Sequence, residues 1–332
     1  MIDKNRAAEI CRGFSEQDVM VVGDLMLDRY VTGTVRRISP EAPVPVVQVT
    51  GERSLPGGAA NVAKNIGQLG GKAYVAGAVG ADKDGDELIH VLEQSGADVR
   101  GVFRCEGFST TVKTRIVADR QQVVRVDTEA SMVFDAAMIE GVRSRVSGLI
   151  GSVGGVIIED YGKGTVCQPV VDTVCAESHA QGVAVGLDPK DNHDLQFSYL
   201  TLATPNYAEA CSAAGIPVHG RVEEPETDEA LASMGQTLLE RWHADLLVIT
   251  LGPKGMYLMN REQPPQVIPT HAREVYDVSG AGDTVIATAM LALLSGASHY
   301  EAAALANYAA GIVVGKLGAA TCTTDELLET IE

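Results

Sequence analysis

Aromatic side chains are scarce in this 332-residue sequence, in which phenylalanine, tyrosine and tryptophan together make up 5% of the residues. A buried core must therefore be built from valine, isoleucine, leucine and alanine, and a hydrophobic content of 45% is ample for that. Paired cysteines are also missing, because none of the six stands in a CxxC arrangement or beside a group of histidines. This spacing argues against a disulfide framework and against a structural zinc site.

Long apolar runs are absent as well. The longest, at residues 284–294, is too short to span a bilayer. The charged N-terminal segment, residues 1–12, lacks the apolar region of a signal peptide. We therefore expect a cytoplasmic protein that makes no contact with a membrane.

Positive charge is in short supply. The sequence has 26 lysines and arginines against 44 aspartates and glutamates, which gives a formal net charge of -18. Such a field repels nucleic acid and anionic membrane surfaces, so we expect neither as a partner. A phosphate-binding site would have to be made locally, from a few basic side chains and backbone N–H groups.

Short apolar runs alternate with stretches of helical spacing over much of the sequence. A first run at residues 18–22 ends in Gly23-Asp24, and later runs stand at residues 156–158, 183–187, 200–203 and 246–250. This alternation is typical of a parallel sheet with helices on both faces. We predict one doubly wound α/β domain over residues 1–332, with a mostly parallel sheet flanked by helices.

Two β-rich segments, near residues 31–49 and 108–127, do not fit this alternation. Within the second, residues 111–118 and 122–127 read as the two strands of a hairpin. We predict that the β-rich segments pair as a small β-sheet lid over the active site. Because exposed β edges tend to pair with a second copy of a chain, we also expect a homodimer through this lid.

The strongest chemical signal is the segment DVSGAGDT at residues 277–284, which opens a predicted helix. Its glycines let the backbone approach a ligand, and the first N–H groups of a helix favour an anion. An aspartate at that end would repel a phosphate, but it suits a general base for an attacking hydroxyl. Spacing alone leaves open that Asp283 only caps the helix.

This segment resembles the C-terminal signature D-x-x-G-A-G-D of the ribokinase, or PfkB-type, family of carbohydrate kinases. The family's N-terminal signature has a counterpart in LPGGAANVA at residues 55–63, in the right order along the chain. The resemblance covers essentially the whole sequence. It implies an α/β core with a β lid and an enzyme that transfers a phosphoryl group from ATP to a sugar hydroxyl.

By position in these signatures, the resemblance assigns the catalytic base to Asp283. It implies that the backbone of Gly280, Ala281 and Gly282 forms the anion hole for the transferred phosphoryl group. It implies that the sugar is bound by Gly57, Gly58, Asn61 and Asp24. Without the family, the two neighbouring glycines could be a tight turn and the early aspartate only a loop carboxylate.

The nucleotide side has matching pieces. The loop TLGPKG at residues 250–255 resembles the family's Thr/Ser-x-Gly-x-x-Gly loop, and it is not a Walker A loop because its lysine stands between the glycines. The residues that the resemblance places at ATP are Thr250, Gly252, Gly255, Asn206 and Asn307. With Asn206, which could equally be a helix N-cap, Glu209 matches the element that organises Mg²⁺ through water. A monovalent cation such as K⁺ is implied near Asp277.

Four further segments resemble the members of the family that act on bacterial D-glycero-β-D-manno-heptose 7-phosphate. They are residues 23–30, 36–45, 159–164 and 188–190. The resemblance implies transfer to O1, which gives the 1,7-bisphosphate for ADP-heptose and lipopolysaccharide core synthesis. Two acids in these segments, Asp160 and Asp188, are then expected at the substrate.

Basic residues beside the motifs also fit a phosphorylated substrate. In a strongly acidic protein a sugar phosphate needs local cations, and the candidates are Lys64, Arg120, Lys163 and Lys190. Each could instead be a solvated surface charge. Several of them lie in glycine- or proline-containing loops at strand ends, where open α/β sheets bind ligands.

Three other functions remain compatible with parts of this pattern. One is a kinase for a different sugar or sugar phosphate, of the fructose phosphate or ribose type. Another is a protein on the same fold that binds nucleotide or sugar without catalysis, against which the intact Asp283 argues. A dinucleotide-dependent oxidoreductase is the third, and the first strand lacks the GxGxxG motif that it would need.

Overall fold

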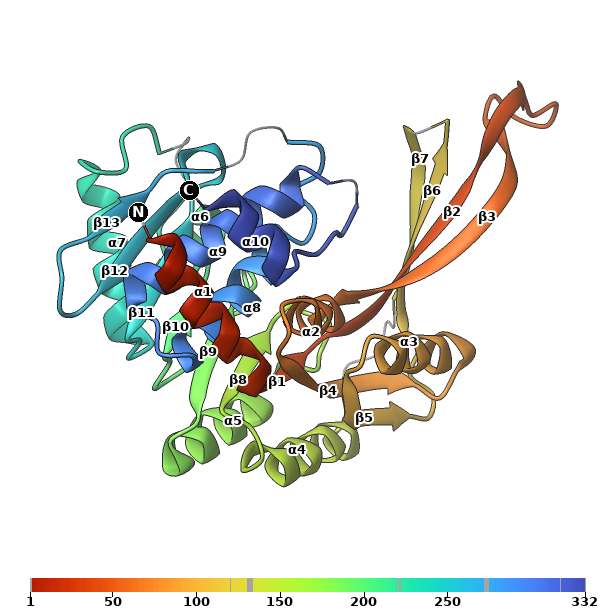
Figure 1. The fold of residues 1–332 in the computed structure, drawn as a ribbon. Helices are drawn as coiled ribbons and strands as arrows, with labels where there is room; N and C mark the ends of the chain where they lie inside the picture. The colour runs from red at the N-terminus through yellow and green to blue at the C-terminus, as the bar shows by residue number, and fades with distance from the viewer. Residues whose placement is uncertain are drawn as a thin grey trace.

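The apolar runs of the sequence form one nine-stranded sheet in the body of the molecule (Figure 1). The computed structural model describes residues 2–119, 121–129, 134–218, 220, 222–271, 275–316 and 318–331. The strands, in sheet order, are β13 Gln266–Ile268, β12 Met256–Asn260, β11 Leu246–Thr250, β10 Leu202–Ala203, β9 Ala184–Asp188, β8 Gly155–Glu159, β1 Asp18–Gly23, β4 Lys72–Gly80 and β5 Asp98–Cys105. Neighbours from β11 to β5 are parallel, whereas β12 and β13 pair antiparallel. The prediction of a mostly parallel sheet is confirmed.

Helices cover both faces of this sheet because its strands are apolar on both sides. Along β1, Val19 and Val21 join one hydrophobic cluster while Met20 and Val22 join the other, as the alternation of side chains along a strand requires. The first face carries α1 Lys4–Gly13, α2 Ala59–Gln68, α3 Lys83–Gln94, α8 Ala281–Leu294, α9 His299–Val314 and α10 Thr324–Thr330. The second carries α4 Ala136–Ile150, α5 Gln168–Gln181, α6 Tyr207–Ala214 and α7 Glu229–Arg241.

Helices α2 and α8 both begin at a glycine. Helix α9 is capped by the Ser298 side chain, whereas α2 and α8 start at Gly58 and Gly280 with no side-chain cap. Both glycines have positive φ, 58° and 81°, a conformation that strains any residue with a Cβ. An uncapped first turn keeps N–H groups available to a ligand.

Four further strands form a separate sheet that projects from the α/β body (Figure 1). Its order is β3-β2-β6-β7, and its strands are β2 Leu25–Ile38, β3 Pro45–Gly58, β6 Thr111–Ala118 and β7 Gln121–Thr128. Strands β2 and β3 form one antiparallel hairpin, β6 and β7 form another, and β2 pairs parallel with β6. The predicted hairpin is therefore present.

The long hairpin of the smaller sheet reaches further toward the body than the predicted segment at residues 31–49. Strand β2 starts at Leu25 and β3 ends at Gly58, and these two residues are register partners. This reach brings the N-terminal signature to the start of α2. Among the described residues, no helix combines the length and the apolar character needed to cross a membrane.

Candidate active site

The start of α8 borders two cavities. It can pack closely against α2 because residue 280 is a glycine. A Cβ added at Gly280 would lie 2.9 Å from Nδ2 of Asn61 on α2. The two uncapped helix starts are therefore packed against each other. The residues that follow, Ala281 and Gly282, line one cavity, whereas Gly280 and Asp283 line the other.

The first cavity, which we call the polar cavity, has a volume of about 170 Å³. Five residues expected from the signatures line it: Gly57, Gly58, Asn61, Gly280 and Asp283. The rest of its lining was not anticipated from the sequence, and consists of Met26, Asp28, Lys113, Arg115, Tyr161, Ser279 and Ala319. It thus combines a buried carboxylate with two basic side chains from β6.

The second cavity, which we call the apolar cavity, has a volume of about 300 Å³. Four of the residues expected at ATP line it: Thr250, Gly252, Gly255 and Asn307. Its remaining lining is largely small or aliphatic, with Pro253, Met256, Thr270, Val275, Val278, Val285, Ala310, Gly311 and Val314. Such a surface suits the flat face of a purine base.

Asp283 is buried and receives two side-chain hydrogen bonds. Nδ2 of Asn61 donates to Oδ2 at 2.5 Å, and the Tyr161 hydroxyl donates to Oδ1 at 2.9 Å. Burial raises the pKa of Asp283, and the two hydrogen bonds oppose that rise because they favour the ionised carboxylate. The side chain does not cap α8, so the alternative of a purely capping aspartate does not describe it.

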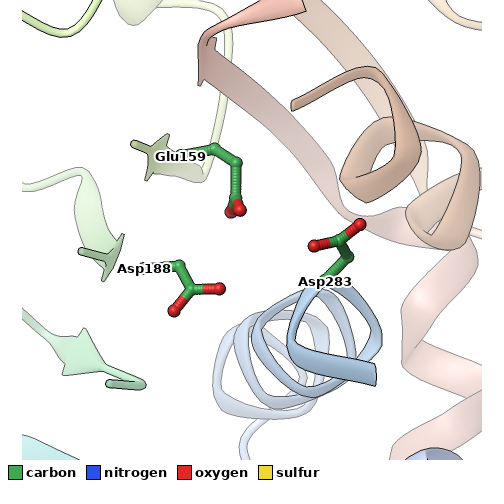
Figure 2. A group of neighbouring side chains, drawn as sticks. All are labelled: Glu159, Asp188 and Asp283. Atoms are coloured by element: carbon green, nitrogen blue, oxygen red, sulfur yellow. The ribbon is translucent and has the colours of Figure 1, made fainter. Parts of the chain in front are cut away.

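Two further carboxylates, the buried Glu159 and the half-buried Asp188, face Asp283 from neighbouring strand ends (Figure 2). Glu159 ends β8 and Asp188 ends β9. One carboxylate oxygen from each of Glu159, Asp188 and Asp283 lies within 4.8 Å of the other two. Burial, followed by repulsion from neighbouring acids, raises the pKa of Glu159 and of Asp188 well above the ordinary range. These three side chains could hold a metal ion.

Glu159 was not singled out from the sequence, although a signal was there. Acids end two successive parallel strands, and the carboxyl ends of parallel neighbours share one edge of the sheet. Oε2 of Glu159 is buried and has no hydrogen-bond partner in the described part of the chain. An unpaired buried carboxylate oxygen is costly, which is a reason to expect a cation or a proton beside it.

The residues expected at magnesium and at the monovalent cation have local hydrogen-bond partners. Asn206 and Glu209 form a capping box at the start of α6, each side chain accepting the other's backbone N–H. The Asp277 carboxylate accepts N–H groups of Ser279 and Gly318. It thereby joins the turn before α8 to a second loop.

Asp24 has a different position from the expected sugar contact. It is buried, it does not line the polar cavity, and its two oxygens accept the backbone N–H groups of Tyr161, Lys163 and Thr165 at 2.9–3.0 Å. Its carboxylate therefore holds the loop after β8. The acid of β2 that does line the cavity is Asp28, which pairs with Arg115 at 2.6 Å.

Asp160 also serves the loop after β8. It accepts the backbone N–H of Gly162 and lies 2.6 Å from Nδ1 of His193. It is not among the residues that line the polar cavity.

Three of the four basic residues expected at the substrate phosphate, Lys64, Lys163 and Lys190, are not among the described residues that line the polar cavity. Lys163 pairs with Glu129, and Lys190 pairs with Asp191. Lys64 lies on α2, where burial lowers its pKa, and Arg120 lies outside the described residues. The cavity's own cations are Lys113 and Arg115, both on β6.

Known proteins resemble this chain along nearly its whole length. It is 40% identical over 95% of its residues to the bifunctional protein HldE of Gluconacetobacter diazotrophicus, and 42% identical over 96% to that of Azotobacter vinelandii. In each case it spans about 64% of the relative's length.

Solved structures show the same fold at lower identity. Ribokinase from Arabidopsis thaliana, in complex with ribose and ATP, is 20% identical, and the match covers 95% of this chain and 99% of that one with a TM-score of 0.68. Phosphofructokinase-2 from Escherichia coli, in complex with potassium, is 17% identical over 95% and 98% with a TM-score of 0.74.

The family assignment rests on a match that covers most of the chain. The model of the pfkB family of carbohydrate kinases matches residues 16–326. That span contains both glycine signatures, the residues that line both cavities, and the strand ends that carry Glu159 and Asp188. The chain belongs to the pfkB family and is an ATP-dependent carbohydrate kinase.

Proposed function

We propose that this kinase phosphorylates O1 of D-glycero-β-D-manno-heptose 7-phosphate to the 1,7-bisphosphate, for ADP-heptose and lipopolysaccharide core synthesis. The main support is the meeting of two cavities at the start of α8. Asp283 lines the polar cavity and Gly282 lines the apolar one. A sugar in the first and ATP in the second would meet at residues 280–283.

The residues at this junction supply the elements of phosphoryl transfer. Asp283 takes the proton of the sugar hydroxyl as its oxygen attacks the terminal phosphoryl group of ATP. The backbone of Gly280, Ala281 and Gly282 stabilises the charge on the transferred group. Little covalent chemistry is left to the protein, so positioning and electrostatics carry most of the catalysis. The smaller sheet is the lid that excludes water from this reaction.

Two basic side chains support a phosphorylated sugar. Lys113 and Arg115 stand at alternate positions of β6 and both line the polar cavity. Arg115 already pairs with Asp28, whereas no carboxylate lies within ion-pair distance of Lys113 in the described chain. Burial lowers the pKa of Lys113, which is a cost that a bound phosphate would offset.

The acidic strand ends fit a divalent cation. Oε2 of Glu159 is buried and has no hydrogen-bond partner among the described residues, and Asp188 lies beside it. We assign Mg²⁺ to Glu159 and Asp188, with Glu209 acting through water, and we reserve Asp283 for the proton. Mg²⁺ at this place would neutralise charge on the phosphates of ATP. A monovalent cation such as K⁺ near Asp277 is part of the same proposal.

We also propose a homodimer through the smaller sheet. Its outer strands, β3 and β7, present unpaired edges, and edges of this kind tend to pair with another chain. Neither nucleic acid nor a membrane surface is proposed as a partner, since the net charge of -18 repels both. The place of action that we propose is the cytoplasm.

A coupled assay of ADP release tests the substrate. We would compare D-glycero-β-D-manno-heptose 7-phosphate with the unphosphorylated heptose, fructose 1-phosphate, fructose 6-phosphate and ribose. The heptose phosphate should have the highest kcat/KM, by about tenfold or more, because a site built for a charged group rejects analogues without it. A higher kcat/KM for ribose or a fructose phosphate would overturn the substrate and leave the kinase assignment intact.

Asp283→Asn tests the base. It should lower kcat by about 10²- to 10⁴-fold, the usual contribution of a general base, while calorimetric binding of ATP and sugar persists. The amide keeps the size of the side chain and its contact with Asn61, so the fold should be retained. Turnover within about threefold of the wild type would refute Asp283 as the base.

A further inference from the structure

A tyrosine hydroxyl lies within hydrogen-bond distance of the carboxylate that we propose as the base. Tyr161 lines the polar cavity, and its hydroxyl is 2.9 Å from Oδ1 of Asp283. A tyrosine hydroxyl is protonated near neutral pH, and an ionised carboxylate only accepts hydrogen bonds. The hydroxyl therefore donates to Asp283.

Tyr161 is fixed independently of Asp283. Its backbone N–H donates to Oδ2 of Asp24, and the N–H groups of Lys163 and Thr165 donate to the same buried carboxylate. Gly162 and Gly164, with φ of 64° and 110°, give the loop the turns that this wrapping requires. The donor is thus held in place before any substrate binds.

The opposite oxygen of Asp283 is held from another element. Nδ2 of Asn61, on α2, donates to Oδ2 at 2.5 Å. With one donor on each oxygen, the carboxylate cannot rotate about its side chain without losing a bond. Each oxygen still has a second lone pair for the hydroxyl of a substrate.

We infer that Tyr161 is a positioning residue for phosphoryl transfer, which fixes the carboxylate of Asp283 toward the polar cavity. The inference rests on the proposed role of Asp283 as the base. Misplacement of a reacting group by about 1 Å can lower the rate by about 100-fold. A tyrosine hydroxyl whose only role was to complete a hydrogen bond in the buried core would not need to line the cavity.

Tyr161→Phe tests this assignment, since it removes the hydroxyl and keeps the ring. We expect kcat to fall by about 10- to 100-fold, with the KM for ATP and for the sugar within about threefold of the wild type. The control is Tyr74→Phe on β4, which removes the hydroxyl of a buried tyrosine that accepts a hydrogen bond from Lys72 at 2.6 Å. That control should leave kcat unchanged.

The double variant Tyr161→Phe with Asp283→Asn shows whether Tyr161 acts through Asp283. In single-turnover assays, Tyr161→Phe should slow the Asp283→Asn enzyme by less than about twofold, because coupled residues are not additive. An equal slowing in both backgrounds would overturn the inference, as would a rise in sugar KM at unchanged kcat. Failure of Asp283→Asn to slow turnover would instead overturn the proposed base.

Discussion

Burial and hydrogen bonding have opposite effects on the ionisation of Asp283. Burial raises its pKa, and a raised pKa favours the neutral form that cannot act as a base. The donors on its two oxygens, from Asn61 and Tyr161, favour the ionised form. A general base works best when its pKa lies near the working pH, and this balance of burial against hydrogen bonds is a way to reach that range.

The signatures predicted only part of the residues around Asp283. Asn61 and Asp283 stand in glycine-rich motifs that can be read from one stretch of sequence. Lys113 stands in a strand without such a motif, and Tyr161 stands in the segment at residues 159–164, where only Asp160 and Lys163 were predicted at the substrate. Both reach the cavity because β6 pairs with β2 and because Asp24 anchors the loop after β8. Their positions depend on tertiary contacts that periodicity does not contain.

Lys113→Ala should separate recognition of the phosphate from catalysis. We expect the KM for the sugar phosphate to rise by about 10- to 100-fold, as for loss of a hydrogen bond to a charged group. The efficiency with an unphosphorylated sugar should change little. Steady-state kinetics on both substrates would measure this.

Lys83→Ala, at an exposed lysine that begins α3, is the control for lost positive charge and should match the wild type. Equal losses on phosphorylated and free sugar would show that Lys113 supports the cavity and does not read the phosphate.

At the level of elements, the strands and helices of the body followed from local pattern. The apolar runs became β8, β9, β10 and β11, and the glycine signatures became the starts of α2 and α8. The sequence predicted too short a long hairpin. The inner part of β2 is buried against the body, so it lacks the alternation of buried and exposed residues that marks a strand with one exposed face. Its extension brings Asp28 to the cavity.

Asp24→Ala should destabilise the loop after β8. Three backbone N–H groups would lose their common acceptor, and each unsatisfied buried group costs about 1–3 kcal/mol. We expect the free energy of unfolding to fall by at least about 2 kcal/mol in chemical denaturation, allowing for some rescue by water.

The control is Asp245→Ala, at an exposed carboxylate, which should change stability by no more than about 0.5 kcal/mol. The opposite pattern for Asp24→Ala, with normal stability and lost sugar binding, would restore the sequence-based expectation that Asp24 contacts the sugar.

Across the whole molecule, negative charge surrounds a site that must bind phosphates. The net charge is -18, and the acids Glu159, Asp188 and Asp283 lie close together at the edge of the sheet. In the proposed function, phosphates are bound locally by the N–H groups at the starts of α2 and α8, by the basic side chains of β6 and by Mg²⁺ at the strand ends. Such a site would favour ligands that arrive with Mg²⁺ over free anions.

The proposed dimer has its own apolar surface on the smaller sheet. Val124 and Val126 are 45% and 50% exposed on β7, two residues apart and hence on one face. Val49 on the opposite edge strand is 57% exposed. Burial of such side chains against a second copy would stabilise the pair by about 25 cal/mol for each Å² removed from water.

Val126→Asp should weaken this dimer. Wild type should sediment at micromolar concentration with twice the 34.9 kDa mass of the chain, and the variant should shift toward the monomer, with a Kd raised about tenfold or more by a buried unpaired charge. The matched control is Val218→Asp, at a valine that is 54% exposed and lies outside the smaller sheet. It adds the same charge and should remain dimeric. A monomeric wild type, or equal dissociation by both variants, would show that the smaller sheet is not a dimer interface, and the proposed lid would then have to act without contacts from a second chain.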